Sequence, residues 1–150
     1  MRSLLIALAV VFAAAPVFAS EKTDVVASVH QFIDGFNKGD AATALAACAS
    51  PVSIVDEFPP HAWQGRTACK DWSNDYNTDA KKKDLTDGIV TLGKPRRVDV
   101  TGDRAYAVVP ATYTYKLHGK HVTESGAFFT VALRRAGSRW LITGWTWTRT

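Results

Sequence analysis

Asp56 is the residue of this 150-residue chain whose type and position best suit chemistry. In the apolar, β-branched segment Val52–Phe58 it shares alternation with Val52 and Ile54, so its side chain should face the core if those two are buried. Desolvation raises the pKa of a buried carboxyl group, which suits proton abstraction next to a carbonyl. By the same alternation, Glu57 should point the opposite way, towards solvent or a partner subunit.

Four further side chains could assist such a carboxylate. His61 follows Pro59 and Pro60 in a predicted loop, where it is either a base that titrates near neutral pH or a solvated surface histidine. Tyr76, Tyr113 and Tyr115 could donate a hydrogen bond to a developing oxyanion, or they could fill the core with their rings.

Tryptophans recur along the sequence and could build a wall for a flat or cyclic ligand. Trp63 and Trp72 are the ligand-binding candidates among them, and Trp145 and Trp147 are predicted to share a strand face with Leu141. Aromatic residues at these spacings also suit a hydrophobic core, so both interpretations stay open.

Cys48 and Cys69 are the two cysteines of the chain. Neither lies in a close-spaced Cys/His motif, so we predict no metal site and favour a structural disulfide over a reactive thiol. Such a bridge would close a loop of about 20 residues and stabilise the fold by about 3 kcal/mol.

The first 19 residues have the pattern of a secretory signal peptide. Arg2 precedes an apolar stretch from Leu4 to Ala15, and small residues at Val17 and Ala19 mark a cleavage site. The stretch is too short to span a membrane, so we expect an exported protein, periplasmic or secreted, without membrane attachment after cleavage. Residues 20–150 would then form a single domain.

The composition is that of an ordinary globular domain, with 47% hydrophobic and 21% charged residues and a formal net charge of +4. Basic clusters such as Lys81–Lys83 lie among aspartates and form no continuous basic stripe. We therefore do not expect the protein to bind nucleic acid.

Apolar spacing predicts three helices in the first half of the chain. A helix from Val25, capped by Thr23 or Asp24 and ended by Gly39, precedes a second one over 41–48, and a third follows over 66–79. A polar connector over 77–88 leads to the second half.

In the second half, apolar and polar residues alternate with a period of two. Extended runs over 97–101, 104–117, 121–134 and 139–149, separated by tight-turn residues, predict an antiparallel meander, with 89–92 as an additional edge segment.

This order of elements resembles the nuclear-transport-factor-2-like (NTF2-like) superfamily. The resemblance is carried by Phe36–Asp40 between the first helices, by Asp56, by Gly65 before the third helix, by the hairpin over 100–105, and by Trp140 and Ile142. Within it, the sequence is most similar to exported SnoaL-like, ketosteroid-isomerase-like proteins of undetermined activity.

The resemblance implies an α+β, cystatin-like cone, in which three N-terminal helices pack against a curved antiparallel sheet around an apolar pocket. It also implies that a pocket carboxylate performs acid–base chemistry in the isomerases and cyclases, and that the outer sheet face often forms a homodimer.

Two functions follow from these residues. The first is an exported domain that binds a small, apolar or cyclic ligand without a complete catalytic set. The second is an isomerase or lyase that needs no cofactor and uses Asp56 as general acid or base, assisted by His61 or a tyrosine.

Overall fold

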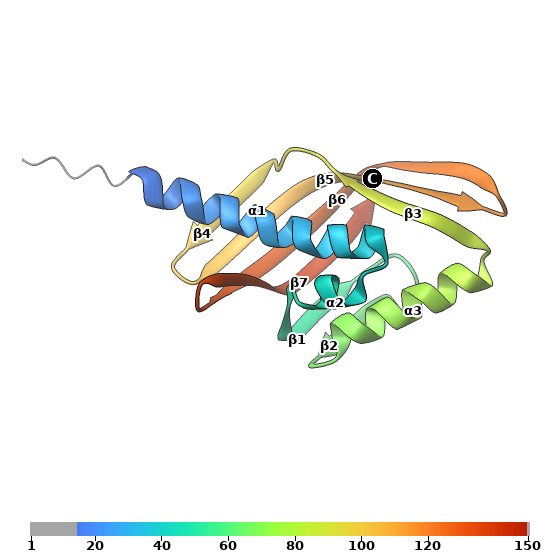
Figure 1. The fold of residues 1–150 in the computed structure, drawn as a ribbon, viewed down its shortest axis with the longest axis horizontal. Coiled ribbons are helices and arrows are strands. Elements are labelled where there is room, and N and C mark those ends of the chain that lie inside the picture. Colours follow the sequence, from blue (N-terminus) through green and yellow to red (C-terminus); the bar gives the residue numbers. More distant parts are fainter. Residues whose placement is uncertain (1–14, 150) are drawn as a thin grey trace, which may run out of the picture.

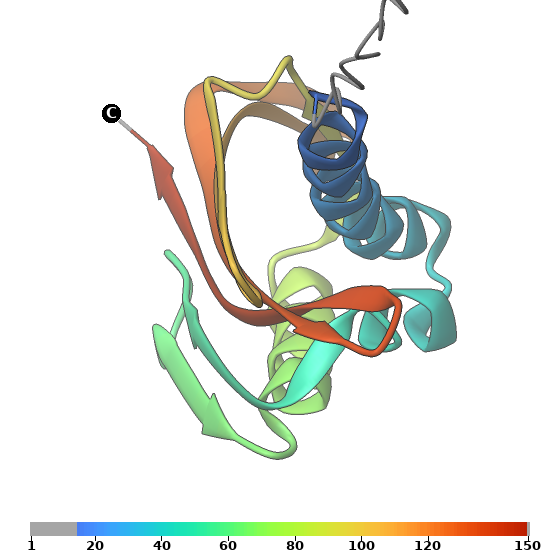
Figure 2. The same ribbon diagram turned by 90° about the vertical axis from the view of Figure 1, so that its left-hand side faces the viewer.

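The computed structural model describes residues 15–149, with side chains from residue 21 onward. In this part of the chain three helices pack against one curved sheet (Figures 1 and 2). The helices are α1 (Ala15–Lys38), α2 (Ala41–Leu45) and α3 (Ala68–Lys82). The strands are β1 (Cys48–Val55), β2 (Ala62–Gly65), β3 (Leu85–Leu92), β4 (Arg97–Thr101), β5 (Arg104–Leu117), β6 (Lys120–Ala136) and β7 (Arg139–Arg149).

The sheet has seven strands in the order β2-β1-β7-β6-β5-β3, with β4 also paired to β5. Figure 2 shows how it curls around one side of the helices. This confirms the predicted α+β, NTF2-like fold. The sheet is nevertheless mixed, because β1 runs parallel to β7. The prediction of a purely antiparallel sheet is wrong there, since two strands so far apart in sequence are not joined by a tight turn that would fix their direction.

The core lies between the inner sheet face and the helices. Val25, Val29 and Phe32 of α1 are buried in one cluster with Phe129 of β6 and Ile142 of β7, and Phe32 stacks on Phe129. Alternation predicts that every second residue of β5 from Ala105 to Leu117 shares one face, and over the first half of the strand these residues, Ala105 to Ala111, are buried.

α1 begins earlier than predicted. Its described part starts at Ala15, so Thr23 and Asp24 lie inside the helix and do not cap it. No helix-breaking residue separates 17–24 from the amphipathic segment, and Pro16 is tolerated in a first turn. The end of α1 is as predicted, because Gly39 takes a positive φ of 65° and its N–H donates to the carbonyl of Phe36. Residues 1–14 of the predicted signal peptide lie outside the described residues.

α2 is shorter than predicted, and β1 starts earlier. Asp40 caps α2 by accepting a hydrogen bond from the backbone N–H of Thr43 at 3.1 Å. The helix ends at Leu45, and Cys48 already pairs with Ile142 of β7. Pairing with β7 therefore overrides the local helix preference of this alanine-rich segment.

α3 and its flanks also differ from the prediction. The loop predicted around His61 leads directly into strand β2, which pairs with β1, and α3 continues to Lys82. Most of the predicted polar connector therefore belongs to α3 and to the start of β3. Three strands of the second half have the predicted bounds, and β6 is slightly longer.

A disulfide joins Cys48 at the start of β1 to Cys69 in α3, with a Cα–Cα distance of 6.6 Å. It confirms the predicted bridge and fixes the first helical turn of α3 to the sheet. The α3 residues that follow, Trp72 and Tyr76, face the interior from this anchored position.

Candidate functional site

A cavity of about 300 Å³ lies between α1, α3 and the inner face of the sheet. This volume is at the lower end of the range for ligand pockets, roughly 300–1,000 Å³. Ten of the side chains that line it are aromatic: Phe32, Phe36, Phe58, Trp72, Tyr76, Tyr113, Tyr115, Phe129, Trp145 and Trp147.

The floor of the cavity is a packed group of rings from four elements. Trp72 meets Trp145 edge to face with a centroid distance of 4.9 Å, and Phe32 stacks on Phe129 at 5.9 Å. Because these rings hold one another in place, the floor is an apolar surface that exists before any ligand binds.

Asp56 follows directly after the last residue of β1 and points into this cavity. Its Oδ2 accepts a hydrogen bond from the indole N–H of Trp72 at 2.8 Å, and its Oδ1 accepts one from the backbone N–H of Glu57 at 2.7 Å. Burial raises the pKa of the Asp56 carboxyl group above its usual value, although both hydrogen bonds oppose this shift.

Two tyrosines meet across the cavity wall. The hydroxyl groups of Tyr76 from α3 and Tyr113 from β5 hydrogen-bond to each other. They meet beside Gly88 of β3, where a Cβ atom would lie 2.5 Å from the Tyr113 oxygen and 2.8 Å from the Tyr76 oxygen. Burial raises the pKa of both tyrosines, so both hydroxyl groups stay protonated at neutral pH.

A charged network stands at the edge of the cavity. Arg149 at the end of β7 forms ion pairs with Glu57 at 2.7 Å and with Glu124 of β6 at 2.9 Å. Glu124 also accepts a hydrogen bond from the Tyr115 hydroxyl at 2.9 Å. The network links the loop after β1 to the ends of β6 and β7.

Glu57 corrects one prediction. It is exposed to solvent, as predicted, but it also lines the cavity together with Asp56 and so does not point the opposite way. Strand β1 ends at Val55, so the alternation that governs a strand no longer applies to the two residues that follow.

A bulge in β7 corrects the prediction that Trp145 and Trp147 share a strand face with Leu141. Leu133 pairs with Ile142 but its neighbour Ala132 pairs with Gly144, so β7 has one extra residue at this point. The bulge changes the alternation and places Trp145 on the buried face with Ile142, whereas Leu141 is only partly buried. Trp145 and Trp147 therefore do not share a face with Leu141.

The structure brings most of the predicted site residues together. Asp56, Trp72, Tyr76, Tyr113 and Tyr115 all line this cavity. This proximity is a matter of geometry, and their roles in binding or catalysis stay predictions.

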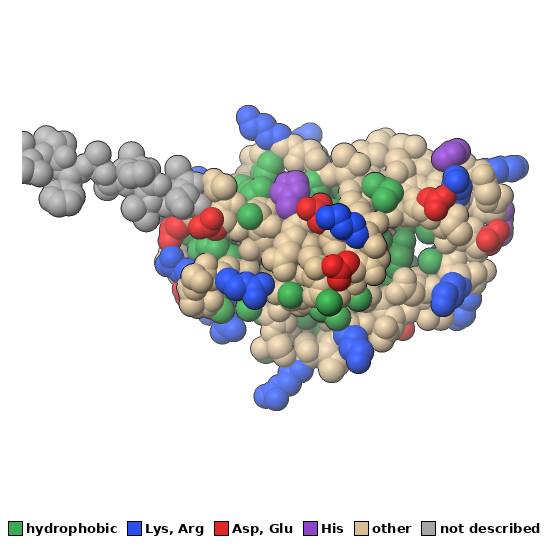
Figure 3. Space-filling view, in the orientation of Figure 1, with side chains coloured by type: hydrophobic (Ala, Val, Ile, Leu, Met, Phe, Trp, Pro, Cys, Tyr) green, Lys and Arg blue, Asp and Glu red, His purple; other side chains and the backbone are tan. Residues whose placement is uncertain are grey.

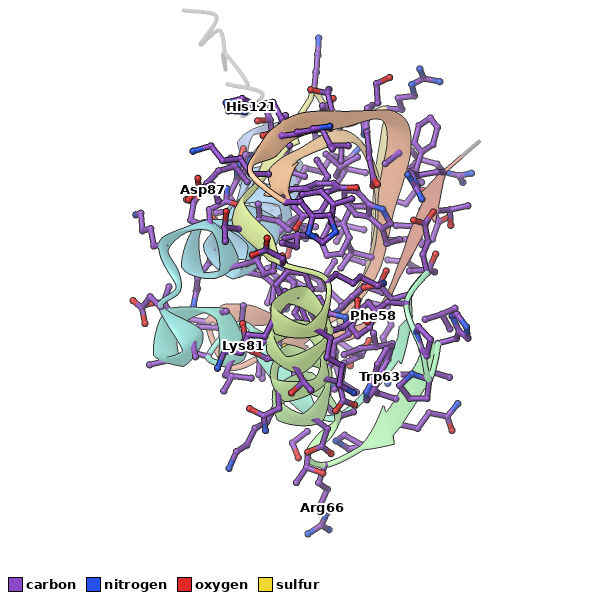
Figure 4. The ribbon with its side chains drawn as sticks, turned by 90° about the vertical axis from the view of Figure 1, so that its right-hand side faces the viewer. Phe58, Trp63, Arg66, Lys81, Asp87 and His121 are labelled. Atoms are coloured by element: carbon purple, nitrogen blue, oxygen red, sulfur yellow. A yellow bond between two sulfur atoms is a disulfide. The ribbon has the colours of Figure 1, made fainter. Side chains whose placement is uncertain are left out.

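His61 and Trp63 lie outside the cavity lining. His61 is exposed, and its Nδ1 lies 3.2 Å from the backbone carbonyl oxygen of Asp56. Trp63 is buried on β2, and its indole N–H donates to Asp75 at 2.8 Å. Figure 4 shows Phe58 beside α3 on the cavity side, with Trp63 beyond it towards the β1–β2 hairpin.

Three functional candidates escaped sequence reasoning: Glu124, Arg149 and Gly88. Arg149 lies two residues beyond Trp147 on the same strand, so alternation alone would have placed it on the cavity face. Glu124 pairs with Tyr113, but an irregularity near Gly126 hides this from the sequence.

Within residues 15–149, no group of three or more His, Cys, Asp or Glu side chains is arranged to hold a metal ion. Among the helices of the same region, none is long and apolar enough to cross a membrane.

The chain matches the SnoaL-like domain over residues 25–146. It belongs to this family. No curated protein matches it. Solved structures with the same fold include the hexachlorocyclohexane dehydrochlorinase LinA-type3 from Novosphingobium barchaimii, which is 12% identical with a TM-score of 0.74 and 87% of each chain covered.

Two further structures resemble this SnoaL-like domain. A candidate dehydratase of the NTF2-like family from Streptomyces avermitilis is 17% identical with a TM-score of 0.70, covering 88% of this chain and 97% of its own. A candidate ketosteroid isomerase from Shewanella frigidimarina is 23% identical with a TM-score of 0.64, covering 83% of this chain and 94% of its own. Identities this low establish a shared fold, and the SnoaL-like fold hosts more than one activity.

Proposed function

We propose that this SnoaL-like protein is exported and binds a small, largely apolar or cyclic ligand in the aromatic cavity. The observation that carries the proposal is the cavity itself, a partly open space walled largely by aromatic rings, with Asp56 and the Tyr76–Tyr113 pair among the polar groups that line it. Such a combination of apolar surface and a few convergent polar groups is typical of small-molecule sites.

The polar groups would orient the ligand. Asp56 can accept a hydrogen bond from a ligand hydroxyl or amine, and the Tyr76–Tyr113 pair can both donate and accept. A ligand of this kind would place its apolar body over Trp72 and Trp145 and its polar group beside Asp56.

Export rests on the signal-peptide pattern of residues 1–19, and the Cys48–Cys69 disulfide supports it because such bonds persist in oxidising compartments. Removal of those residues would leave one domain over 20–150. Expression of the full chain in bacteria tests export: fractionation should recover mature protein, beginning at Ser20, outside the cytoplasm.

Binding is tested with 4-tert-butylphenol as a probe in isothermal titration calorimetry. Leu117→Trp introduces a large ring into the cavity lining, whereas Leu141→Trp makes the same change at a partly buried residue that is not among the cavity-lining residues. We expect the probe to bind the wild type and Leu141→Trp, and to lose at least tenfold in affinity for Leu117→Trp. Equal affinity for the two variants would contradict binding in this cavity.

A second candidate function is acid–base catalysis by Asp56, as an isomerase or lyase that needs no cofactor. One observation favours it: a carboxyl group with a raised pKa and a pair of protonated tyrosine hydroxyls face the same space. That arrangement suits proton abstraction next to a carbonyl, with a hydroxyl group stabilising the oxyanion that forms.

The two functions separate in deuterium exchange. A general base should catalyse exchange of the α-protons of 4-tert-butylcyclohexanone in D₂O, followed by proton NMR, and Asp56→Asn should abolish the exchange. If the ketone binds wild-type protein but exchanges no faster than in buffer alone, the protein is a binding module for this class of compound.

A further inference from the structure

The cavity is acidic although the protein is basic. Four carboxyl groups line it but only two basic side chains do, whereas the whole chain has a formal net charge of +4. The acidic residues are Asp56, Glu57, Asp79 and Glu124, and the basic ones are Lys83 and Arg149. On the face that Figure 3 shows, acidic and basic side chains are interspersed.

The ion pairs of the cavity leave one carboxyl group unmatched. Lys83 pairs with Asp79 at 2.7 Å, and Arg149 pairs with both Glu57 and Glu124. Within the described residues, no Lys or Arg forms an ion pair with the side chain of Asp56, whose partners are two neutral N–H groups.

The unmatched carboxyl group stands at the ring edge of Trp72, in a cavity that is lined by further aromatic rings. Trp72, which donates to Asp56, stacks on Tyr76 with a centroid distance of 5.9 Å and an interplanar angle of 25°. Aromatic faces carry partial negative charge and attract ammonium groups, most strongly where water is excluded. The aromatic walls and Asp56 therefore both favour a positively charged ligand.

We propose, building on the ligand-binding function above, that the ligand is an organic cation: a compact ring or alkyl body bearing a protonated or quaternary amine. The ammonium group lies beside Asp56 and against the faces of the aromatic residues, and the apolar body lies on the floor formed by Phe129 and Trp145. An anionic ligand of the same size would meet the unpaired Asp56 carboxylate in a lining with more acidic than basic side chains, and is disfavoured.

Three probes of similar size test this inference on the oxidised wild-type protein. Phenyltrimethylammonium is the cation, tert-butylbenzene is its neutral isostere, and benzenesulfonate is an anion. Binding is followed by the fluorescence of the cavity tryptophans and by calorimetry. We expect the cation to bind at least tenfold more tightly than the isostere, equivalent to about 1.4 kcal/mol, and benzenesulfonate to bind most weakly.

Asp56→Asn should bring the affinity for the cation to within about threefold of that for the isostere. Asp71→Asn removes the same charge from the chain at a residue that does not line the cavity, so this control should leave the preference for the cation intact. Salt gives a second measurement that needs no variant, since the affinity for the cation should fall between 20 and 300 mM NaCl while that for the isostere should not.

The outcomes separate the two proposals. If tert-butylbenzene binds as tightly as the cation, the charge inference is wrong and the ligand-binding function stands. If none of the three probes binds, and 4-tert-butylphenol also fails, both proposals are wrong. A cation preference that survives Asp56→Asn would overturn the role of Asp56 in selecting charge.

Discussion

Asp56→Asn is the substitution whose effect on stability follows most directly from the structure. It removes the charge but keeps the shape and one of the two acceptor oxygens. Of the two hydrogen bonds at 2.8 Å and 2.7 Å, asparagine can retain one, and losing the other costs about 1 kcal/mol. The removal of a desolvated charge offsets this loss. We therefore expect the free energy of unfolding at pH 7 to change by no more than about 1 kcal/mol.

The pH dependence carries a definite sign. The pKa of Asp56 is higher in the folded than in the unfolded protein, so its contribution to stability is fully present below the unfolded pKa, about 3.9, and is lost as pH rises through the folded pKa. The wild type should thus lose stability relative to Asp56→Asn as pH rises from 3.5 to 7.

Urea unfolding of the oxidised proteins over this pH range measures both effects. Asp40→Asn is the matched control with the opposite sign, because hydrogen bonds from Thr43 lower the pKa of Asp40 and its contribution is lost as pH falls. If Asp56→Asn lost about 2 kcal/mol or more at pH 7, or if its pH trend followed that of Asp40→Asn, Asp56 would be a structural hydrogen-bond acceptor and the reasoning would be refuted.

Three further predictions concern stability and the shape of the cavity. Reducing the Cys48–Cys69 disulfide, which spans 21 residues, should lower the free energy of unfolding by about 3 kcal/mol in urea titrations with and without dithiothreitol. Gly88→Ala should cost about 1–2 kcal/mol by displacing the tyrosine pair, whereas Gly93→Ala, whose nearest contact would be at 3.5 Å, should cost less; equal thermal melting temperatures would contradict this. Phe129→Ala, at a side chain that is 1% exposed, should cost about 3–5 kcal/mol in urea unfolding, and a loss below about 1 kcal/mol would show that the ring does not support the cavity floor.

Alternation predicted the cavity face only where strands are regular. It placed Tyr113 and Tyr115 on the side of Ala105 correctly, because β5 itself has no extra residue there. It failed at Glu57, which follows the end of a strand, and at Trp145, which follows a bulge. Strand ends and bulges depend on partner strands that are distant in sequence, so local patterns do not reveal them.

The polar cavity groups show the same limit. Asp56 was found because the segment just before it carries a β-branched pattern, whereas the link between Glu124 and Arg149 depends on the pairing of β6 with β7 and of β7 with β1. The parallel direction of β1 and β7 also has no local signal. Export and a homodimer formed through the outer sheet face stay predictions.

The central claim is that the aromatic cavity is the ligand site, and the five tryptophans of the chain allow a direct test. Three of them line the cavity, Trp72, Trp145 and Trp147, whereas Trp63 and Trp140 are buried elsewhere. Titrating ¹⁵N-labelled protein with 4-tert-butylphenol should shift the indole N–H resonances of the first three and leave the other two in place. Unchanged resonances of the three cavity tryptophans, or equal shifts at Trp63 and Trp140, would contradict the account.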